Sequence, residues 1–377
     1  AEDPDVEPII DEDDPEVAAL LKGDDLLNFG PLTAAFSKYD RMRQTPLLAG
    51  RTIDWELVGR LGATERLQAV IPARWRRLFD IPAEQYRVFT LEFFSTFAYS
   101  AGKRLTDETA VQFRLGGQLR RMSVAQFARR LDLYTDEEIE QTTFTDTIRT
   151  VSVRKNFGGI SGSVLKEWWL TIGSGEFVSP ASSRLIRDPF IRFLHRAITG
   201  TITARYESNE KVTQDDLLVL YCLIRPGEGN VASILLHFLD RARTGASRIC
   251  QGHYVTMLAR AFGLLDEYDL QSLVPGPQAT TISETDMVQM QLLTETVPRR
   301  FADPEPLAIA DAGDEGTSQA PSRRPQPRRA PRASDPPVTL ASVRDEVREV
   351  REEVRSLTDW VVQALRDIAA ERGVELQ

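Results

Sequence analysis

Hydrophobic residues recur at helical spacing through most of the chain between residues 27 and 274. Phe89, Phe93 and Phe97 fall on one stripe of residues 83–99, and this spacing predicts a helix. We therefore expect a mainly α-helical globular domain over residues 27–274. The same reasoning predicts helices that open at the N-caps Asp54 and Ser123 and helices over residues 136–142, 163–172, 189–198, 214–224, 231–243 and 253–265.

One segment shows the alternation that is typical of strands. Hydrophobic and polar residues alternate on both sides of Gly116-Gly117, from Phe113 to Met122. Two consecutive glycines suit a two-residue hairpin turn, because both central positions of that turn need a left-handed backbone. The sequence therefore predicts one small β-hairpin. It carries too few other strand signals for a doubly wound sheet or a polymerase core.

The last part of the chain, residues 339–373, has the strongest periodicity. Hydrophobic residues occupy two series of positions seven apart, the second three residues after the first, over four heptads. This spacing predicts a coiled coil through which the chain associates with itself, and Glu346 and Arg351 are placed to attract one another between parallel chains. Docking of the helix onto its own globular domain is the alternative. The seam consists of Leu340, Val343, Val347, Val350, Val354, Leu357, Val361, Ala364 and Ile368.

Composition separates two further regions. The 377 residues are 42 % hydrophobic and carry a formal net charge of −10. Residues 1–25 hold eleven acids and one base, so an acidic arm over residues 1–26 accounts for the charge of the whole chain. Its composition predicts disorder, as does that of a Pro-, Ala- and Arg-rich linker over residues 275–338. Within this linker, residues 285–296 have the spacing of one short helix.

Cysteine content and hydropathy restrict the cellular compartment. Two cysteines are too few for a disulfide-stapled scaffold, and a reducing compartment is expected. There is no run of about 18 apolar residues, and the acidic start lacks the apolar core of a signal peptide. We therefore expect no membrane partner and a cytoplasmic location, with the nucleus as the alternative.

One tract of the linker is a candidate nucleic-acid contact. Five arginines lie within residues 323–332 without an acid among them. An unfolded Arg-Pro tract neutralises phosphates without needing a defined structure, so RNA or single-stranded DNA is a candidate partner. A soluble linker without a partner and a nuclear-import signal are the alternatives. The tract consists of Arg323, Arg324, Arg328, Arg329 and Arg332.

Metal ligands are scarce. Cys250 and His253 have the spacing of a zinc ligand pair, and Cys222 and His237 would be needed to complete the set. However, Cys222 lies inside the hydrophobic run of residues 217–224, where a thiol behaves as a small hydrophobic group. We therefore expect core cysteines and histidines and no metal.

Enzymatic motifs are equally weak. Residues 227–232 fit the G-x-G-x-x-A pattern of dinucleotide-binding proteins, but no further βα units follow, and no acid lies about 20 residues onward to bind a ribose. The acidic groups Asp215-Asp216 and residues 136–138 stand at predicted helix starts, where carboxylates act as caps. We therefore expect a non-enzymatic protein without catalytic residues or cofactors.

Three segments together resemble a known family. They are residues 113–134, 212–223 and 252–264, and in this order they resemble the Gag-like first-reading-frame proteins of plant Athila-class LTR retroelements. The resemblance spans roughly residues 70–270. It implies a plant source and a role in coating element RNA and assembling particles, and it transfers no catalytic residues.

These observations predict a structural retroelement protein that associates with itself and binds nucleic acid. One alternative is a transposase or integrase-type nuclease, which needs a carboxylate triad on a β-sheet to hold two metals. Another is a host regulatory adaptor that recruits a partner through the coiled coil.

Overall fold

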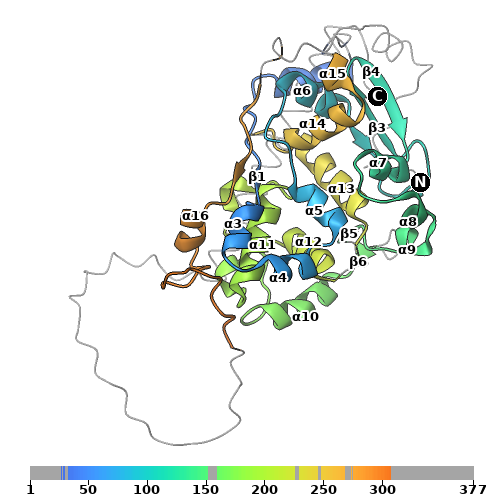
Figure 1. Ribbon diagram of the computed structural model, residues 1–377. Coiled ribbons are helices and arrows are strands. Elements are labelled where there is room, and N and C mark those ends of the chain that lie inside the picture. Colours follow the sequence, from blue (N-terminus) through green and yellow to red (C-terminus); the bar gives the residue numbers. More distant parts are fainter. Residues whose placement is uncertain are drawn as a thin grey trace, which may run out of the picture. The chain divides into compact units, whose positions relative to one another are not determined.

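The computed structural model shows that helices make up the largest share of the described chain, which confirms a mainly α fold (Figure 1). All described residues belong to one structural unit. The acidic arm up to residue 26, the arginine tract and the heptad seam lie outside them, so their predictions stay predictions. The structure describes residues 27, 29, 33–151, 159–225, 229–244, 248–267, 273 and 275–306.

Most of the helices expected from the sequence are present. The predicted helix over residues 253–265 is divided, because Gly263 adopts a left-handed backbone with φ of 75°. The helices are α2 Ala34–Met42, α3 Trp55–Arg60, α4 Thr64–Val70, α5 Ala73–Phe79, α6 Arg87–Thr96, α7 Val124–Arg130, α8 Asp136–Glu140, α9 Thr142–Thr145, α10 Gly162–Ile172, α11 Pro189–Gly200, α12 Gln214–Ile224, α13 Val231–Thr244, α14 Gly252–Ala261, α15 Leu264–Glu267 and α16 Glu284–Gln289. Two 3-10 helices are η2 Ser183–Leu185 and η3 Tyr206–Ser208.

Polar side chains begin several helices, as predicted. Ser123 and Gln126 form a capping box at α7, and Thr213 and Asp216 form another at α12. Thr135 and Glu138 do the same at α8. The acids at the starts of α8 and α12 therefore act as caps, which confirms that interpretation.

The predicted hairpin is confirmed. Strand β3 (Val111–Leu115) pairs antiparallel with β4 (Gln118–Met122), and Leu115 faces Gln118 across the turn. Gly116 and Gly117 have φ of 67° and 75°, so both central positions of the turn are left-handed. The other strands have two residues each: β1 Arg51–Thr52, β2 Ala98–Tyr99, β5 Thr150–Val151, β6 Gly159–Ile160, β7 Ala181–Ser182, β8 Lys211–Val212 and β9 Thr280–Thr281.

A buried carboxylate holds the hairpin turn on α6. Glu92 is fully buried and accepts the backbone N–H groups of Gly116 and Gly117, each at 2.8 Å. The guanidinium of Arg114, which is 2 % exposed, lies 3.0 Å from the same carboxylate. Burial raises the pKa of Glu92, and the two N–H groups and Arg114 act against this rise. The turn is therefore fixed by an ion pair inside the core.

The hydrophobic core runs between the hairpin and the central helices. The ring of Phe113 on β3 packs 5.0 Å from that of Phe93 on α6, and Trp168 on α10 packs 5.2 Å from Tyr221 on α12. Helix α12 is buried over nearly its whole length. In Figure 1 the hairpin and α15 lie at one end of this body and α10 at the other.

The packed body continues beyond residue 274, into the region that composition places in the linker. Strand β9 pairs in parallel with β1, and Ile282, Met287 and Leu292 are almost fully buried. The short helix expected within residues 285–296 is present as α16. Backbone pairing and three buried side chains therefore outweigh a composition rich in proline and charge.

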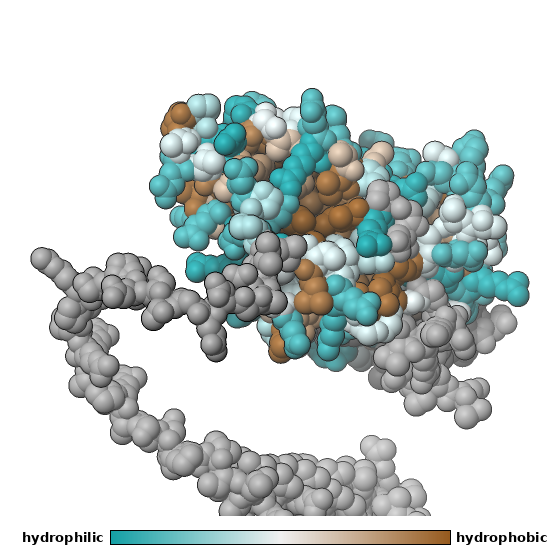
Figure 2. Space-filling view, turned by 90° about the horizontal axis from the view of Figure 1, so that it is seen from below, coloured by the Kyte–Doolittle hydropathy of each residue, from teal (hydrophilic) through white to brown (hydrophobic). Residues whose placement is uncertain are grey.

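Few large hydrophobic side chains of the described part reach the surface. On the face seen from below, hydrophobic residues form several patches that hydrophilic residues separate (Figure 2). None of the described helices has the length and hydropathy that a membrane-spanning segment requires. The most exposed hydrophobic side chains are Leu170, Val178 and Val297.

Candidate nucleic-acid interface

Three helices end beside one another with arginines in their last turns. A hollow of about 430 Å³ lies between the ends of α5, α7 and α14. Hollows of about 510 Å³ beside α5 and about 360 Å³ beside β4 share lining residues with it. We call the three hollows together the arginine groove. The arginines that line it are Arg74, Arg76, Arg77, Arg120, Arg121, Arg129, Arg130 and Arg260.

The groove has an excess of positive charge. Among the described residues, eight arginines line it, against the three acids Asp80, Asp132 and Glu138, and Asp136 outside the lining forms an ion pair with Arg129. Most of the ion pairs are exposed and weak, such as that between Asp132 and Arg77 at 3.5 Å. Among the described residues, no carboxylate lies within 4 Å of Arg130 or Arg260. These two guanidinium groups are therefore available to an anion.

Aromatic rings hold several of these arginines in place. The guanidinium groups of Arg120 and Arg130 lie 3.9 Å and 5.0 Å from the centroid of the half-buried Phe262 ring. Stacking orients a guanidinium and leaves its N–H edge free to donate to a phosphate. Exposed rings and guanidinium planes also offer surfaces on which unpaired bases stack. Two further stacks place Arg76 4.4 Å from Trp55 and Arg74 4.6 Å from Tyr134.

The local sequence explains these positions. The capping box at Ser123 fixes the start of α7, so that Arg129 and Arg130 fall in its last turn. A cation in the last turn balances the negative end of the helix dipole. Gly263 then ends α14 and holds Phe262 at its C-cap.

The arginine groove was not predicted from the sequence. Its members come from residues 74–77, 120–130 and 260–262, and only the fold brings these segments together. The sequence contained one signal of the groove, since two consecutive arginines occur at residues 76–77, 120–121 and 129–130. The five arginines predicted as nucleic-acid contacts, Arg323 to Arg332, and the seam from Leu340 to Ile368 lie outside the described residues.

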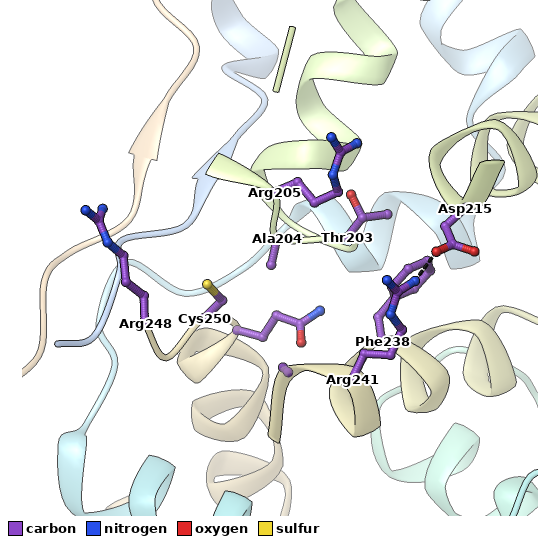
Figure 3. A pocket seen from close by; sticks show the side chains of 10 residues that line it. Thr203, Ala204, Arg205, Asp215, Phe238, Arg241, Arg248 and Cys250 are labelled. Atoms are coloured by element: carbon purple, nitrogen blue, oxygen red, sulfur yellow. Dashed lines mark hydrogen bonds and ion pairs between the residues drawn. The ribbon is translucent and has the colours of Figure 1, made fainter. Parts of the chain in front are cut away.

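A second arginine-lined hollow has a different character. It measures about 200 Å³ and lies beside the starts of α12 and α14 (Figure 3). Arg241 forms an ion pair with Asp215, and Figure 3 shows these two side chains facing one another. Arg205 forms an ion pair with Asp216. Carboxylates of the chain therefore already engage both of these arginines.

Asp216 is the centre of this ionic cluster. It is fully buried, and its carboxylate accepts the Thr213 backbone N–H at 2.7 Å and lies 3.8 Å from His195 Nε2. Burial by itself raises the pKa of Asp216, but His195, Arg205 and the Thr213 N–H outweigh burial and hold the pKa at about 2. The cluster fixes the start of α12 and does not expose a reactive group.

The candidate zinc ligands occupy unrelated surroundings. His253 Nε2 accepts the backbone N–H of Gly50 at 2.9 Å, Cys222 is buried in α12, and Cys250 lines the hollow of Figure 3. The ring of His237 packs against Phe238. Within the described ranges, no group of three His, Cys, Asp or Glu side chains is placed to hold a metal ion.

The glycine-rich motif leads into a helix, as the turn interpretation requires. Residues 226–228 lie outside the described residues. Asn230 precedes α13, and its Oδ1 accepts the backbone N–H of Ser233 at 2.9 Å. Its Nδ2 donates to the carbonyl of Phe144 at 3.0 Å. The side chain of Asn230 therefore caps α13 and links it to α9 through hydrogen bonds.

Comparison with known proteins identifies the family. The model of the ATHILA ORF-1 family matches residues 36–224, which include α5, the hairpin and α7. No curated protein and no solved structure shows significant similarity to the chain. The match confirms the resemblance that the sequence segments indicated. The chain belongs to the ATHILA ORF-1 family of retroelement proteins.

Proposed function

We propose that this chain is a non-enzymatic, Gag-like structural protein of its retroelement, which coats single-stranded nucleic acid and associates with itself. The observation that carries the proposal is the arginine groove, with its excess of positive charge and its arginine–aromatic stacks. The family membership supports it, because the family is one of retroelement first-reading-frame proteins and not of transposases.

The groove suits single strands because it offers two kinds of contact in one surface. Arg130 and Arg260 supply charge that no carboxylate of the described chain neutralises. Phe262 supplies a ring beside them. Phosphate contacts give affinity without sequence preference, and stacking on a ring tolerates every base. A coating protein needs this combination, since it must bind along the whole length of an RNA.

The arginine tract of residues 323–332 extends this binding in the proposal. Its five arginines would add about five phosphate contacts, which corresponds to a log–log salt slope of roughly −3.5 on a single strand. The groove and the tract would then act on one RNA, and their linkage in one chain raises the effective concentration of the second contact.

A binding experiment tests the groove. In the full chain, Arg129→Gln, Arg130→Gln and Arg260→Gln together remove three phosphate contacts, and affinity for a single-stranded RNA in 0.1 M salt should fall by roughly a hundredfold. The matched control is Arg41→Gln, Arg43→Gln and Arg104→Gln, which removes the same charge from exposed positions outside the groove. Fluorescence anisotropy over a salt series measures both.

The two triple variants separate a site from a general charge effect. The groove variant should lose about two units of the log–log salt slope, and the control variant should keep the wild-type slope. Equal losses in the two variants would contradict the groove as the binding site.

Self-association is tested separately. The seam residues would leave a hydrophobic stripe in water unless a second chain covers it. Val354→Asp places a charge in that stripe and should convert an oligomer into a folded monomer, whereas Arg355→Asp, one position outside the seam, should not. Light scattering of the full chain measures this, and a monomeric wild type at micromolar concentration would favour docking of the helix onto its own body.

A further inference from the structure

A third arginine-lined cavity remains, and it lies on α11. It measures about 380 Å³, and its walls are α11, η2, the residues before β8 and the end of α16. Arg192 and Arg196 stand one helical turn apart on α11, and Arg184 lines the cavity from η2. None of its lining residues belongs to the arginine groove or to the hollow of Figure 3.

These three arginines are not paired within the described chain. No carboxylate lies within 4 Å of Arg184, Arg192 or Arg196 in the described ranges. The buried Nε atoms of Arg192 and Arg196 have no hydrogen-bond acceptor, and the best contact of Arg192 is a 3.5 Å approach of Nη2 to the Gln291 carbonyl. The described chain therefore provides no acceptor for the buried Nε atoms of Arg192 and Arg196 and no carboxylate partner for any of the three guanidinium groups.

This arrangement is costly without a ligand. Like charges one turn apart on a helix repel one another. Burial is the main cause that lowers the pKa of Arg192 and of Arg196, and nearby carboxylates only partly act against it, Glu305 and Asp188 at Arg192 and Asp286 and Glu210 at Arg196. The hollow of Figure 3 shows the alternative, since Asp215 and Asp216 form ion pairs with its Arg241 and Arg205. An anion in the α11 cavity would supply the acceptors that the chain does not.

The charge of the cavity indicates the kind of anion. Glu210 is the one carboxylate among the described residues that line it, and three arginines with one glutamate give this lining a net charge of +2. A phosphate monoester carries about −1.5 to −2 at neutral pH, whereas a phosphodiester carries one negative charge. Arginine also matches phosphate oxygens with paired N–H donors. Asn209 and Ser183 add neutral polar groups to the wall.

We propose that the α11 cavity is a binding site for a phosphate monoester, with Arg184, Arg192 and Arg196 as its ligands. Two sources present this group in reach of a nucleic-acid-binding protein: a free mononucleotide and the 5′-phosphate end of an RNA. The site is separate from the arginine groove, so it recognises a terminus or a small molecule and does not take part in coating.

Titration calorimetry on the full chain tests the site with four probes: AMP, adenosine, and one RNA oligonucleotide with either a 5′-phosphate or a 5′-hydroxyl. Binding of AMP without binding of adenosine supports the mononucleotide source. Tighter binding of the 5′-phosphate RNA than of its 5′-hydroxyl form, without binding of AMP, supports the RNA end. The proposal is overturned if AMP binds no better than adenosine and the 5′-phosphate RNA binds no better than the 5′-hydroxyl RNA.

Two variants locate the effect. Arg192→Gln with Arg196→Gln should weaken monoester binding by roughly tenfold or more, because at least two charge-assisted contacts are lost. Arg184→Gln, at an exposed position, should weaken it with no effect on folding. The control is the double groove variant Arg129→Gln with Arg130→Gln, which should weaken 5′-hydroxyl RNA and leave the monoester preference unchanged. A preference that survives in both cavity variants would also overturn the site.

Discussion

The buried arginine of the hairpin and the arginines of the groove show two uses of one residue type. Arg114 is 2 % exposed and lies 3.0 Å from the buried Glu92 carboxylate, which also binds two backbone N–H groups. Arg130 and Arg260 are exposed and have no carboxylate within 4 Å in the described chain. The first arrangement holds the fold together, and the second leaves charge available to a partner. Neutralising substitutions should therefore separate stability from binding.

The largest expected effect is on stability at the hairpin. Glu92→Gln keeps the shape of the side chain but removes the carboxylate charge beside the buried Arg114, which should cost roughly 3–5 kcal/mol in the free energy of unfolding. Urea denaturation of the full chain, followed by tryptophan fluorescence, measures this loss. Glu56→Gln removes the exposed partner of Arg60 and should leave the denaturation midpoint nearly unchanged. Similar midpoints for the two variants would show that burial of the pair is unimportant.

The next largest effect is on the stability of the fold at low pH. The pKa of Asp216 is about 2 in the folded chain, below its ordinary value of 3.8, so its contribution is fully present above about pH 4 and is lost as the pH falls through 2. The shift corresponds to roughly 2 kcal/mol. Asp216→Asn should therefore be less stable than the wild type at pH 6, and the difference should shrink between pH 4 and pH 2. Parallel stability curves for the two proteins would contradict this assignment.

The smallest effect concerns the aromatic part of the groove. Phe262→Leu removes the ring beside Arg120 and Arg130 and keeps a hydrophobic side chain. Affinity for single-stranded RNA should fall by roughly five- to tenfold, because one stacking surface is lost. Phe36→Leu changes another half-buried ring outside the groove and should not alter RNA binding. Unchanged affinity in Phe262→Leu would show that the groove binds RNA through charge and not through stacking.

Local signals predicted the fold well where one segment contained the whole cause. Ser123 predicted the start of α7, and Gly116-Gly117 predicted the hairpin turn, because a cap and a two-residue turn depend only on neighbours in the sequence. The binding of Glu92 to the turn was not predictable in this way, since 24 residues separate it from Gly116. The sequence offered one indication of this contact, since Glu92 is a charged residue within the hydrophobic stripe of residues 83–99.

The candidate site was harder to predict for the same reason. Each Arg-Arg pair of the groove is ordinary by itself, and its meaning depends on Arg260 and Phe262, which follow more than a hundred residues later. The α11 cavity also depends on a distant segment, because Met290 and Leu292 close one side of it from a region whose composition indicated a linker. Sites of this kind arise from tertiary packing and not from a motif.

The pairing of β9 with β1 has a practical consequence for anyone who prepares the folded body by itself. A fragment that stops at residue 274, where composition changes, would remove the parallel neighbour of Thr52 and the side chains of Ile282, Met287 and Leu292. The hydrophobic surfaces that these side chains cover would then face solvent, and the fragment would be prone to aggregation. A recombinant boundary should therefore lie after residue 306, although the sequence changes character more than thirty residues earlier.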